Sequence, residues 1–415
     1  MTTTPDEIAV VGAGIIGLAI AFHLQREGRK VVLIERGGVA EGASYGNAGA
    51  LAFSDVLPLA SPGIMRKAPG WLLDPLGPLS IPPAYLPTIA PWLLRFWRAS
   101  LPDRYRASIA AQCALMRLSS RAMDRMIADA GLSGHVRSDG NLQLYESEAE
   151  FSASLPGWQA REREGIPFEH VRGARLAGLQ PGLSPRFVVG SFTPHWQTVD
   201  DPHLFALALF DKVTAQGARL IRGEVTEAVP SEGGAELRFS DGSASPAGAA
   251  VIAAGAWSRK LCDQLRERIP LETERGYNTT LPPGAFDLRR QLTFGGHGFV
   301  ITPLATGIRI GGAVELGGLK RPPNFARSQI MLEKAAAFLP GLKTGGGKQW
   351  MGFRPSLPDT LPVIGASKAS DRILYAFGHG HSGLTQCAAT AQLIADLLAG
   401  RPSAIPLAPF RPARF

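Results

Sequence analysis

Apolar and polar positions in the first 35 residues follow the pattern of a strand, a helix and a second strand. An apolar run over Ile8–Val11 leads into a glycine turn, Gly12-Ala13-Gly14-Ile15-Ile16-Gly17, and apolar residues then recur at helical spacing as far as Gly28. A second apolar run, Lys30–Ile34, ends in the acidic residue Glu35. This order predicts the start of a dinucleotide-binding α/β fold.

Further elements are scattered along the rest of the chain. Helical spacing covers Ala107–Ala130, Pro202–Gly217 and the stretch from Leu384 to Gly400. Short β-type runs are expected at 141–145, 218–229, 236–239, 249–253, 298–302 and 307–312. We expect the first and the last two of these runs to share an antiparallel sheet. The pattern therefore predicts a two-lobed protein that combines a Rossmann-type α/β lobe with a large, mostly antiparallel sheet.

Length and composition support this picture and exclude some classes of protein. The 415 residues suit two lobes, and 45% hydrophobic with 19% charged residues is typical of an ordered globular chain. The three cysteines, Cys113, Cys262 and Cys387, form no CxxC pair, so we expect neither a metal site nor a disulfide framework. The net charge of +8 comes from dispersed basic residues, which argues against nucleic-acid binding. No signal peptide or membrane span is evident, and a cytoplasmic location is expected.

Each glycine of the first turn has a physical role in holding a dinucleotide. Gly12 permits the tight turn, Gly14 lets the backbone approach a pyrophosphate, and Gly17 lets the helix pack close to the strand. The start of the helix offers free N–H groups and partial positive charge to the phosphates. Glu35 is placed to accept hydrogen bonds from ribose hydroxyls.

Four later segments narrow the choice of cofactor. A small-residue loop covers Gly42–Gly49, Ala254-Gly255-Ala256-Trp257-Ser258 follows a buried-strand pattern, and the C-terminal part holds Gly352-Phe353-Arg354-Pro355 and Gly378-His379-Gly380-His381-Ser382-Gly383. With the first turn, these motifs resemble in their order the D-amino-acid oxidase superfamily of flavoproteins. The greatest similarity is to bacterial D-amino-acid dehydrogenases and D-hydroxyproline dehydrogenases. The resemblance covers the first ~60 residues and most of the chain from Pro194 onward.

The resemblance implies FAD as the cofactor. Sarcosine oxidases of this superfamily carry a cysteine that attaches the flavin, but Gly352 stands at that place here, so noncovalent FAD is expected. The residues assigned to the cofactor are Gly12, Gly14, Ile15, Ile16, Gly17, Glu35, Arg36, Ser44, Asn47, Ala48, Gly49, Val225, Ala254, Gly255, Trp257, Gly380, Ser382, Gly383, Leu384 and Thr385.

Three residues are predicted to act in catalysis. Arg354, in the Gly-x-Arg-Pro motif, is expected to bind the carboxylate of an amino acid through its planar fork; the alternative is a structural pair with Asp359. Tyr277 is expected either to place its hydroxyl over the substrate or to be a half-buried strand residue. His379 or His381 is expected to contact the flavin or to tune the substrate amine. The sequence shows no evident general base.

The three cofactor-binding segments are expected at 1–55, 197–260 and 349–415, and the two substrate-binding segments at 137–196 and 261–348. The segment 56–136 stands apart. Its first part, 56–102, contains ten prolines with Trp71, Trp92, Trp97, Arg95 and Arg98. It is predicted to be either a lid over the substrate site or a surface that docks on the inner face of the plasma membrane. In the second case a quinone would accept the electrons.

These observations predict an FAD-dependent dehydrogenase. Its substrate would be a small D-amino acid or a cyclic imino acid such as hydroxy-D-proline, oxidised to the imine by hydride transfer to flavin N5. Three alternatives remain open: an oxidase of glycine, sarcosine or an opine, a flavin subunit that needs a partner, and a flavin 2-hydroxy-acid dehydrogenase.

Overall fold

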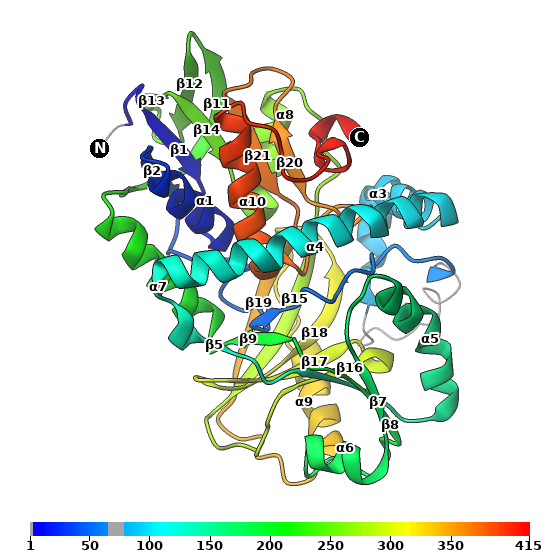
Figure 1. Cartoon of the computed structure of the whole chain (residues 1–415). Coiled ribbons are helices and arrows are strands. Elements are labelled where there is room, and N and C mark those ends of the chain that lie inside the picture. Colours follow the sequence, from blue (N-terminus) through cyan, green and yellow to red (C-terminus); the bar gives the residue numbers. More distant parts are fainter. Residues whose placement is uncertain (1–2, 65–78) are drawn as a thin grey trace.

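The computed structural model describes residues 3–64 and 79–415 and has two lobes (Figure 1). A six-stranded sheet forms the centre of the first lobe. Its strands, in spatial order, are β10 (Arg219–Arg222), β2 (Lys30–Glu35), β1 (Glu7–Val11), β14 (Ala249–Ile252), β21 (Ile373–Phe377) and β20 (Val363–Ala366). Only β20 runs antiparallel to its neighbour. The predicted Rossmann-type lobe is confirmed.

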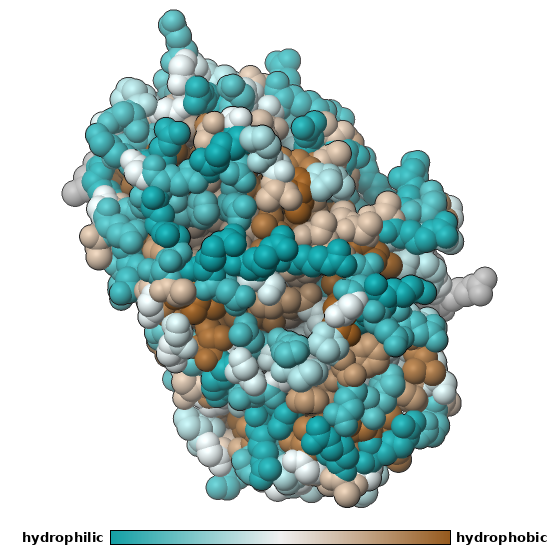
Figure 2. Space-filling view, viewed as in Figure 1, coloured by the Kyte–Doolittle hydropathy of each residue, from teal (hydrophilic) through white to brown (hydrophobic). Residues whose placement is uncertain are grey.

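Both faces of this sheet are covered, which explains why its strands are almost wholly apolar. On one face lie three helices: α1 (Ile15–Arg26), α7 (Pro202–Ala215) and α10 (Gly383–Leu398). The other face carries α8 (Ser258–Gln264) and a small sheet of β11 (Val225–Ser231), β12 (Gly234–Phe239) and β13 (Ala244–Ala247). The long helix α4 (Pro102–Ala130) packs on α10 as an outer layer, and a hydrophilic band crosses the molecule where it lies (Figure 2).

The second lobe is built on a nine-stranded sheet. Eight of its strands follow one another in the order β19 (Lys348–Ser356), β15 (Glu272–Leu281), β18 (Gly307–Leu316), β17 (Phe299–Leu304), β16 (Gln291–Phe294), β6 (Asn141–Tyr145), β8 (Val189–Thr193) and β7 (Glu169–Val171). The ninth, β4 (Leu79–Ser80), pairs with β18. Only the β16–β6 and β18–β4 pairs are parallel, so the predicted, mostly antiparallel sheet is confirmed. Helix α9 (Ala326–Phe338) packs on β15 and β18, and α5 (Glu148–Arg163) and α6 (Gly173–Leu179) lie beside β6 and β8.

The division between the lobes differs from the expected one at two strands. β19 lies in the nine-stranded sheet, although residues 349–415 are expected in the first lobe. Its antiparallel pairing with β15 runs from Glu272↔Ser356 to Thr280↔Lys348, which holds the whole strand in the second lobe. β9 (Gln197–Val199) joins neither large sheet and pairs with β3 (Ala50–Leu51) and β5 (Val136–Arg137).

The described part of the proline-rich segment forms a short helix beside the second lobe. A 3₁₀ turn at Pro83–Tyr85 leads into α3 (Leu86–Ala99). Ile89 and Trp92 are buried and pack with Leu316 of β18, so this helix has one anchored face. Trp71 lies outside the described residues. The other 3₁₀ turns cover Ser133–His135, Gly255–Trp257, Gly295–His297, Ala408–Phe410 and Pro412–Arg414.

Candidate active site

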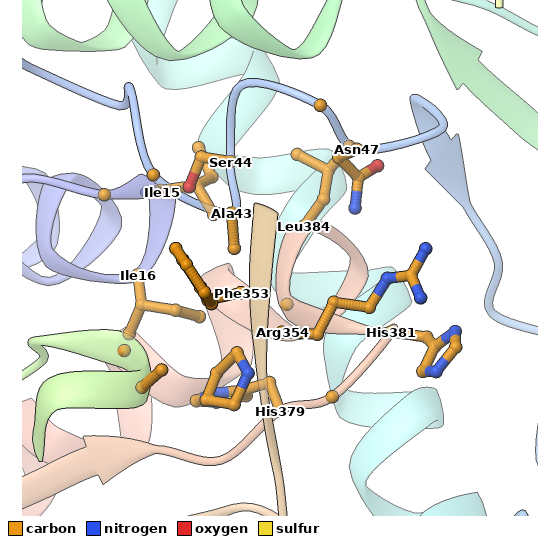
Figure 3. Close-up of a pocket in the computed structure, with 18 of the residues that line it drawn as sticks. Ile15, Ile16, Ala43, Ser44, Asn47, Phe353, Arg354, His379, His381 and Leu384 are labelled. Atoms are coloured by element: carbon orange, nitrogen blue, oxygen red, sulfur yellow. Dashed lines mark hydrogen bonds between the residues drawn. The ribbon is translucent and has the colours of Figure 1, made fainter. Parts of the chain in front are cut away.

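A cavity of about 1060 Å³ lies between the lobes. Its walls come from the start of α1, the loop at 42–48, the segment 253–257, strands β15, β18 and β19, and the segment 379–385 (Figure 3). Pockets for one small ligand are typically about 300–1,000 Å³. The cavity therefore has room for a large cofactor together with a small substrate.

The glycine turn shapes one end of this cavity. Gly12 has a left-handed φ of 110°, and a Cβ there would collide with the backbone oxygen of Ala253. A Cβ on Gly17 would collide with the carbonyl of Gly12, so this glycine brings α1 against the turn. Ser44 reaches the same place from the loop, since its Oγ accepts a hydrogen bond of 3.0 Å from the N–H of Ile15 (Figure 3). The start of α1 thus opens into the cavity with a hydroxyl beside it, as a pyrophosphate site requires.

The adenosine end is marked by Glu35, at the end of β2. The backbone N–H groups of Ala13 and Gly37 each donate to its carboxylate at 2.9 Å, which fixes the carboxylate at the cavity wall. Next to it, the Arg36 guanidinium lies 3.9 Å from the ring centre of Trp257. Val225 begins β11 and also borders the cavity. These groups fit a dinucleotide: a carboxylate for ribose hydroxyls, and flat surfaces for the adenine.

The start of α10 forms the other end of the cavity. Gly380, Ser382, Gly383 and Leu384 border it, and Gly380 has a left-handed φ of 53°. Thr385 borders the cavity too, but its hydroxyl accepts from the N–H of Ala52 and donates to the carbonyl of Ala50. Its side chain therefore joins α10 to the loop after β3, which leaves its backbone for contact with a cofactor.

Arg354 extends from β19 into the cavity past Phe353 (Figure 3). Its guanidinium lies over Gly276 of β15, where a Cβ would collide with it. Its Nη1 donates to the carbonyl of Ala313 at 3.3 Å. The alternative pairing with Asp359 is not formed, because Asp359 bonds Arg414 at 2.7 Å. Burial lowers the pKa of Arg354 and the nearby Glu274 raises it, so the group is a cation inside the molecule.

The side chains of the other two predicted catalytic residues form hydrogen bonds with other residues of the protein. The Tyr277 hydroxyl donates to Glu315 and accepts from the N–H of Asn324 at 3.1 Å, and burial raises its pKa. His379 is buried, with Nε2 2.9 Å from Oγ1 of Thr390, and burial lowers its pKa to about 3. His379 is therefore neutral at physiological pH. Both side chains border the cavity, and their catalytic roles stay predictions.

Three polar residues of the site have no counterpart among the predicted residues. Glu274 of β15 is buried, and its Oε2 lies 2.6 Å from Nε2 of His381. Asn278 donates to the carbonyl of Gly46, and Arg309 of β18 donates to the carbonyls of Tyr45 and Asn47. These last two hold the cofactor loop against the substrate sheet. Glu274, Gly276 and Asn278 alternate along one face of β15, and this alternation is the signal that marks Glu274 and Asn278; it does not mark Arg309, which lies on β18.

The cavity brings together nearly all of the predicted residues. Only Gly17 and Gly49 do not border it. Gly17 acts through packing, as described above. Gly49 has a left-handed φ of 76° and accepts at its carbonyl from the N–H of Val199, so it turns the chain into β3. Cofactor contact by the remaining residues stays a prediction.

Comparison with known proteins assigns the chain to a family. Residues 7–397 match the DAO family, described as FAD dependent oxidoreductase, and the chain belongs to this family. It is 35% identical to a D-amino-acid oxidase of Bradyrhizobium diazoefficiens, with 98% of each chain covered. It is 30% identical to a D-amino acid dehydrogenase of Rhizobium rhizogenes, over 99% of this chain and 100% of the relative.

Solved structures show the same fold. Glycine oxidase from Geobacillus kaustophilus superposes with a TM-score of 0.79 at 22% identity, over 98% of both chains. L-proline dehydrogenase from P. horikoshii has a TM-score of 0.76 at 19% identity, over 100% of this chain and 98% of that one. The protein is therefore an FAD-dependent oxidoreductase, and FAD, which the cavity fits, is its cofactor. The predicted family, fold, enzyme class and cofactor are confirmed.

Proposed function

We propose that the enzyme oxidises the carbon–nitrogen bond of a small D-amino acid or cyclic imino acid to the imine. The observation that carries this is Arg354, a half-buried cation that extends into the cavity and has no carboxylate bonded to it among the described residues. Two relatives that cover nearly the whole chain are named for D-amino acids, which supports the same substrate class.

The protein groups have separate roles in this reaction. Arg354 would bind the substrate carboxylate through two parallel hydrogen bonds and so orient the α carbon. The start of α10, at Gly383, would place N–H groups and partial positive charge where negative charge develops. Bound FAD supplies the acceptor for two electrons and a hydrogen.

The substrate class can be tested by anaerobic titration of the yellow holoenzyme. D- and L-amino acids, hydroxy-D-proline, sarcosine and D-lactate are added separately, and the visible flavin absorbance is followed. We expect bleaching by D-amino or D-imino acids and none by D-lactate. Bleaching by D-lactate alone would replace the proposal with a 2-hydroxy-acid dehydrogenase, and bleaching by none of them would contradict it.

Air oxidation separates an oxidase from a dehydrogenase, since the relatives carry both names. We favour a dehydrogenase that passes its electrons to a quinone or to a partner protein. The flavin of the reduced enzyme is expected to stay reduced after mixing with air for much longer than one turnover takes. A soluble quinone should reoxidise it. Stoichiometric hydrogen peroxide at each turnover would identify an oxidase instead.

We also propose that FAD is held without a covalent bond. Gly352 lies under the ring of Trp350, and a Cβ there would collide with that ring. None of the three cysteines, all of which are described and buried, borders the cavity. Acid precipitation of the holoenzyme should release all of its flavin into the supernatant, and a yellow pellet would contradict the proposal.

A second proposal concerns α3, which we infer docks on an anionic membrane surface. Leu86, Leu94 and Trp97 are 43%, 56% and 45% exposed and lie within about 80° of one another around the helix. Exposed arginines, Arg95 and Arg98, lie beside them. An apolar stripe with adjacent basic residues fits a surface of acidic lipids. No helix within residues 3–64 and 79–415 is long and apolar enough to cross a membrane.

Vesicle sedimentation tests this docking. We expect the holoenzyme to sediment with vesicles rich in phosphatidylglycerol, and Leu94→Glu with Trp97→Glu to leave it in the supernatant. Leu204→Glu is the matched control, because Leu204 is 41% exposed on α7 of the other lobe. Equal sedimentation of both variants would contradict the proposal and favour a lid.

A further inference from the structure

A buried carboxylate, Glu274, is paired with an exposed histidine, His381, at the edge of the cavity. His381 follows β21 and borders the cavity, and its side chain is 42% exposed. Its Nε2 lies 2.6 Å from Oε2 of Glu274, whose side chain is only 6% exposed. A carboxylate accepts hydrogen bonds, so Nε2 carries the proton of this bond. Nδ1 is then the nitrogen that remains to accept a proton from a ligand.

The same carboxylate also faces the predicted substrate anchor. Glu274 and Arg354 are paired residues of β15 and β19. Burial alone would raise the pKa of Glu274, but the charge and hydrogen bond of His381 and the charge of Arg354 lower it below its usual value. Glu274 is therefore ionised, and its negative charge acts on one permanent cation, Arg354, and on one histidine, His381.

Substrate binding would change this balance. An amino acid arrives as a zwitterion, and its carboxylate compensates the charge of Arg354. Arg354 then offsets less of the negative charge of Glu274, whose Oε2 lies 2.6 Å from Nε2 of His381. This happens as the substrate's ammonium group enters the cavity.

We propose that His381, held by Glu274, takes the proton from the ammonium group of the bound substrate. The inference rests on the proposed function, because only an amine substrate brings this proton. One N–H bond of the substrate breaks and an N–H bond at Nδ1 forms, so ammonium and neutral imidazole become neutral amine and imidazolium. No electrons are exchanged in this step. The neutral amine has the free electron pair that a departing hydride requires.

Four of the other titratable groups that border the cavity are bonded to other parts of the protein. Glu35 accepts from two backbone N–H groups, and Asp55 pairs with Arg161 at 3.3 Å. His379 bonds Thr390, and the Tyr277 hydroxyl bonds Glu315. Around His381 the charged groups are thus Glu274 on β15 and Arg354 on β19, with neutral His379 on its own segment. The geometry singles out His381 as the acceptor.

The test compares His381→Asn and Glu274→Gln with the wild-type holoenzyme. The first readout is the rate of flavin bleaching by the best D-amino acid as a function of pH. The second is the affinity for acetate, a carboxylate without an amine, from its effect on the flavin spectrum. His297→Asn is the matched control, because His297 also lies 2.6 Å from a glutamate, Glu146, and does not border the cavity.

We expect His381→Asn to slow bleaching at neutral pH by roughly 10²-fold, the lower end of general acid–base contributions. The rate should recover at alkaline pH, where the amine is already neutral in solution. Glu274→Gln should also shift the pH profile of the bleaching rate toward alkaline pH, by less than His381→Asn does. Acetate affinity should stay within twofold for His381→Asn, and His297→Asn should match the wild type in both readouts.

Two results would overturn the inference alone: an unshifted pH profile of His381→Asn, or a loss of acetate affinity that matches its loss of rate. The second would make His381 part of the carboxylate site. A wild-type enzyme that no amino or imino acid reduces would overturn the proposed function as well.

Discussion

Arg354 shows how a protein keeps a half-buried cation available to a ligand. Its guanidinium fits over Gly276 because that residue has no side chain. It donates to the carbonyl of Ala313 and lies near Glu274. The carboxylate that follows β19, Asp359, is bound by Arg414 and does not neutralise Arg354. The guanidinium of Arg354 therefore faces the cavity with N–H groups that can still bind a ligand.

Arg354→Lys should keep the charge and lose the fork. We expect the efficiency of flavin reduction by the best substrate to fall roughly 10- to 100-fold, which corresponds to the loss of one charge-assisted hydrogen bond of about 1.5–3 kcal/mol. The flavin content should be unchanged. Stopped-flow bleaching over a range of substrate concentrations measures this. Arg290→Lys is the control, because Arg290 donates only to backbone carbonyls of the second lobe; an equal fall in both variants would refute the prediction.

At the scale of residues, the sequence predicts contacts that are local and misses those made by strand pairing. Gly12, Gly17 and Glu35 belong to one contiguous unit, so their spacing is enough to assign them roles. Glu274 meets His381 across more than a hundred residues, through the register of β15 and the turn after β21. No local pattern indicates that pairing, which is why the sequence shows no general base.

At the scale of elements, the start of α7 joins the two lobes. Asp201 caps the helix, since its Oδ1 accepts from the N–H groups of His203 and Leu204. Its Oδ2 accepts from Thr306 at 2.8 Å and lies 3.5 Å from Nη2 of Arg309. The same carboxylate therefore begins a helix of the first lobe and holds the β17–β18 turn and β18 of the second.

Asp201→Ala should lower the free energy of unfolding by about 3 kcal/mol or more, because it removes a helix cap and takes away the carboxylate that pairs with buried Arg309. Asp201→Asn keeps the cap and should lose less. Thermal unfolding of the holoenzymes measures both. Ser147→Ala removes only the cap of α5 and should cost about 1 kcal/mol. A similar loss in Asp201→Ala and Ser147→Ala would mean that Asp201 is no more than a cap.

Element boundaries follow from the sequence where a pattern begins and ends sharply. The strand expected at 141–145 coincides with β6, and the expected start at Pro202 is the start of α7. Helix α4 begins at Pro102, five residues before the expected start. Its first turn is polar and exposed, so apolar spacing does not mark it, although proline at the first helical position is itself a start signal.

At the scale of the whole molecule, the burial of one histidine makes the stability of the fold sensitive to acid. His379 is buried, and its pKa is lowered from an ordinary value near 6.5 to about 3 by that burial. The folded protein keeps this histidine neutral, whereas the unfolded chain binds a proton below about pH 6.5. The stability it contributes is complete above that pH and is lost as the pH falls from about 6.5 toward 3.

We expect the melting temperature of the holoenzyme to fall between pH 6.5 and 5, at a cost of up to about 1.4 kcal/mol per pH unit from this one group. His379→Gln, which does not titrate, should show a smaller fall over this interval. Differential scanning calorimetry at several pH values measures the slope. Glu274, whose pKa is also lowered, loses its contribution only at lower pH, so it does not affect the comparison. Parallel slopes for the two proteins would contradict the prediction.

The interleaved order of the lobes has a consequence for synthesis on the ribosome. Ile8 of β1 pairs with Ala249 of β14, and Ala250 pairs with Ile373 of β21. The glycine turn emerges before β14, the neighbour of β1, and well before β21 and helix α10. The nascent chain therefore displays an unfinished sheet edge during most of its translation, and it gains a complete flavin site only when it is nearly full length.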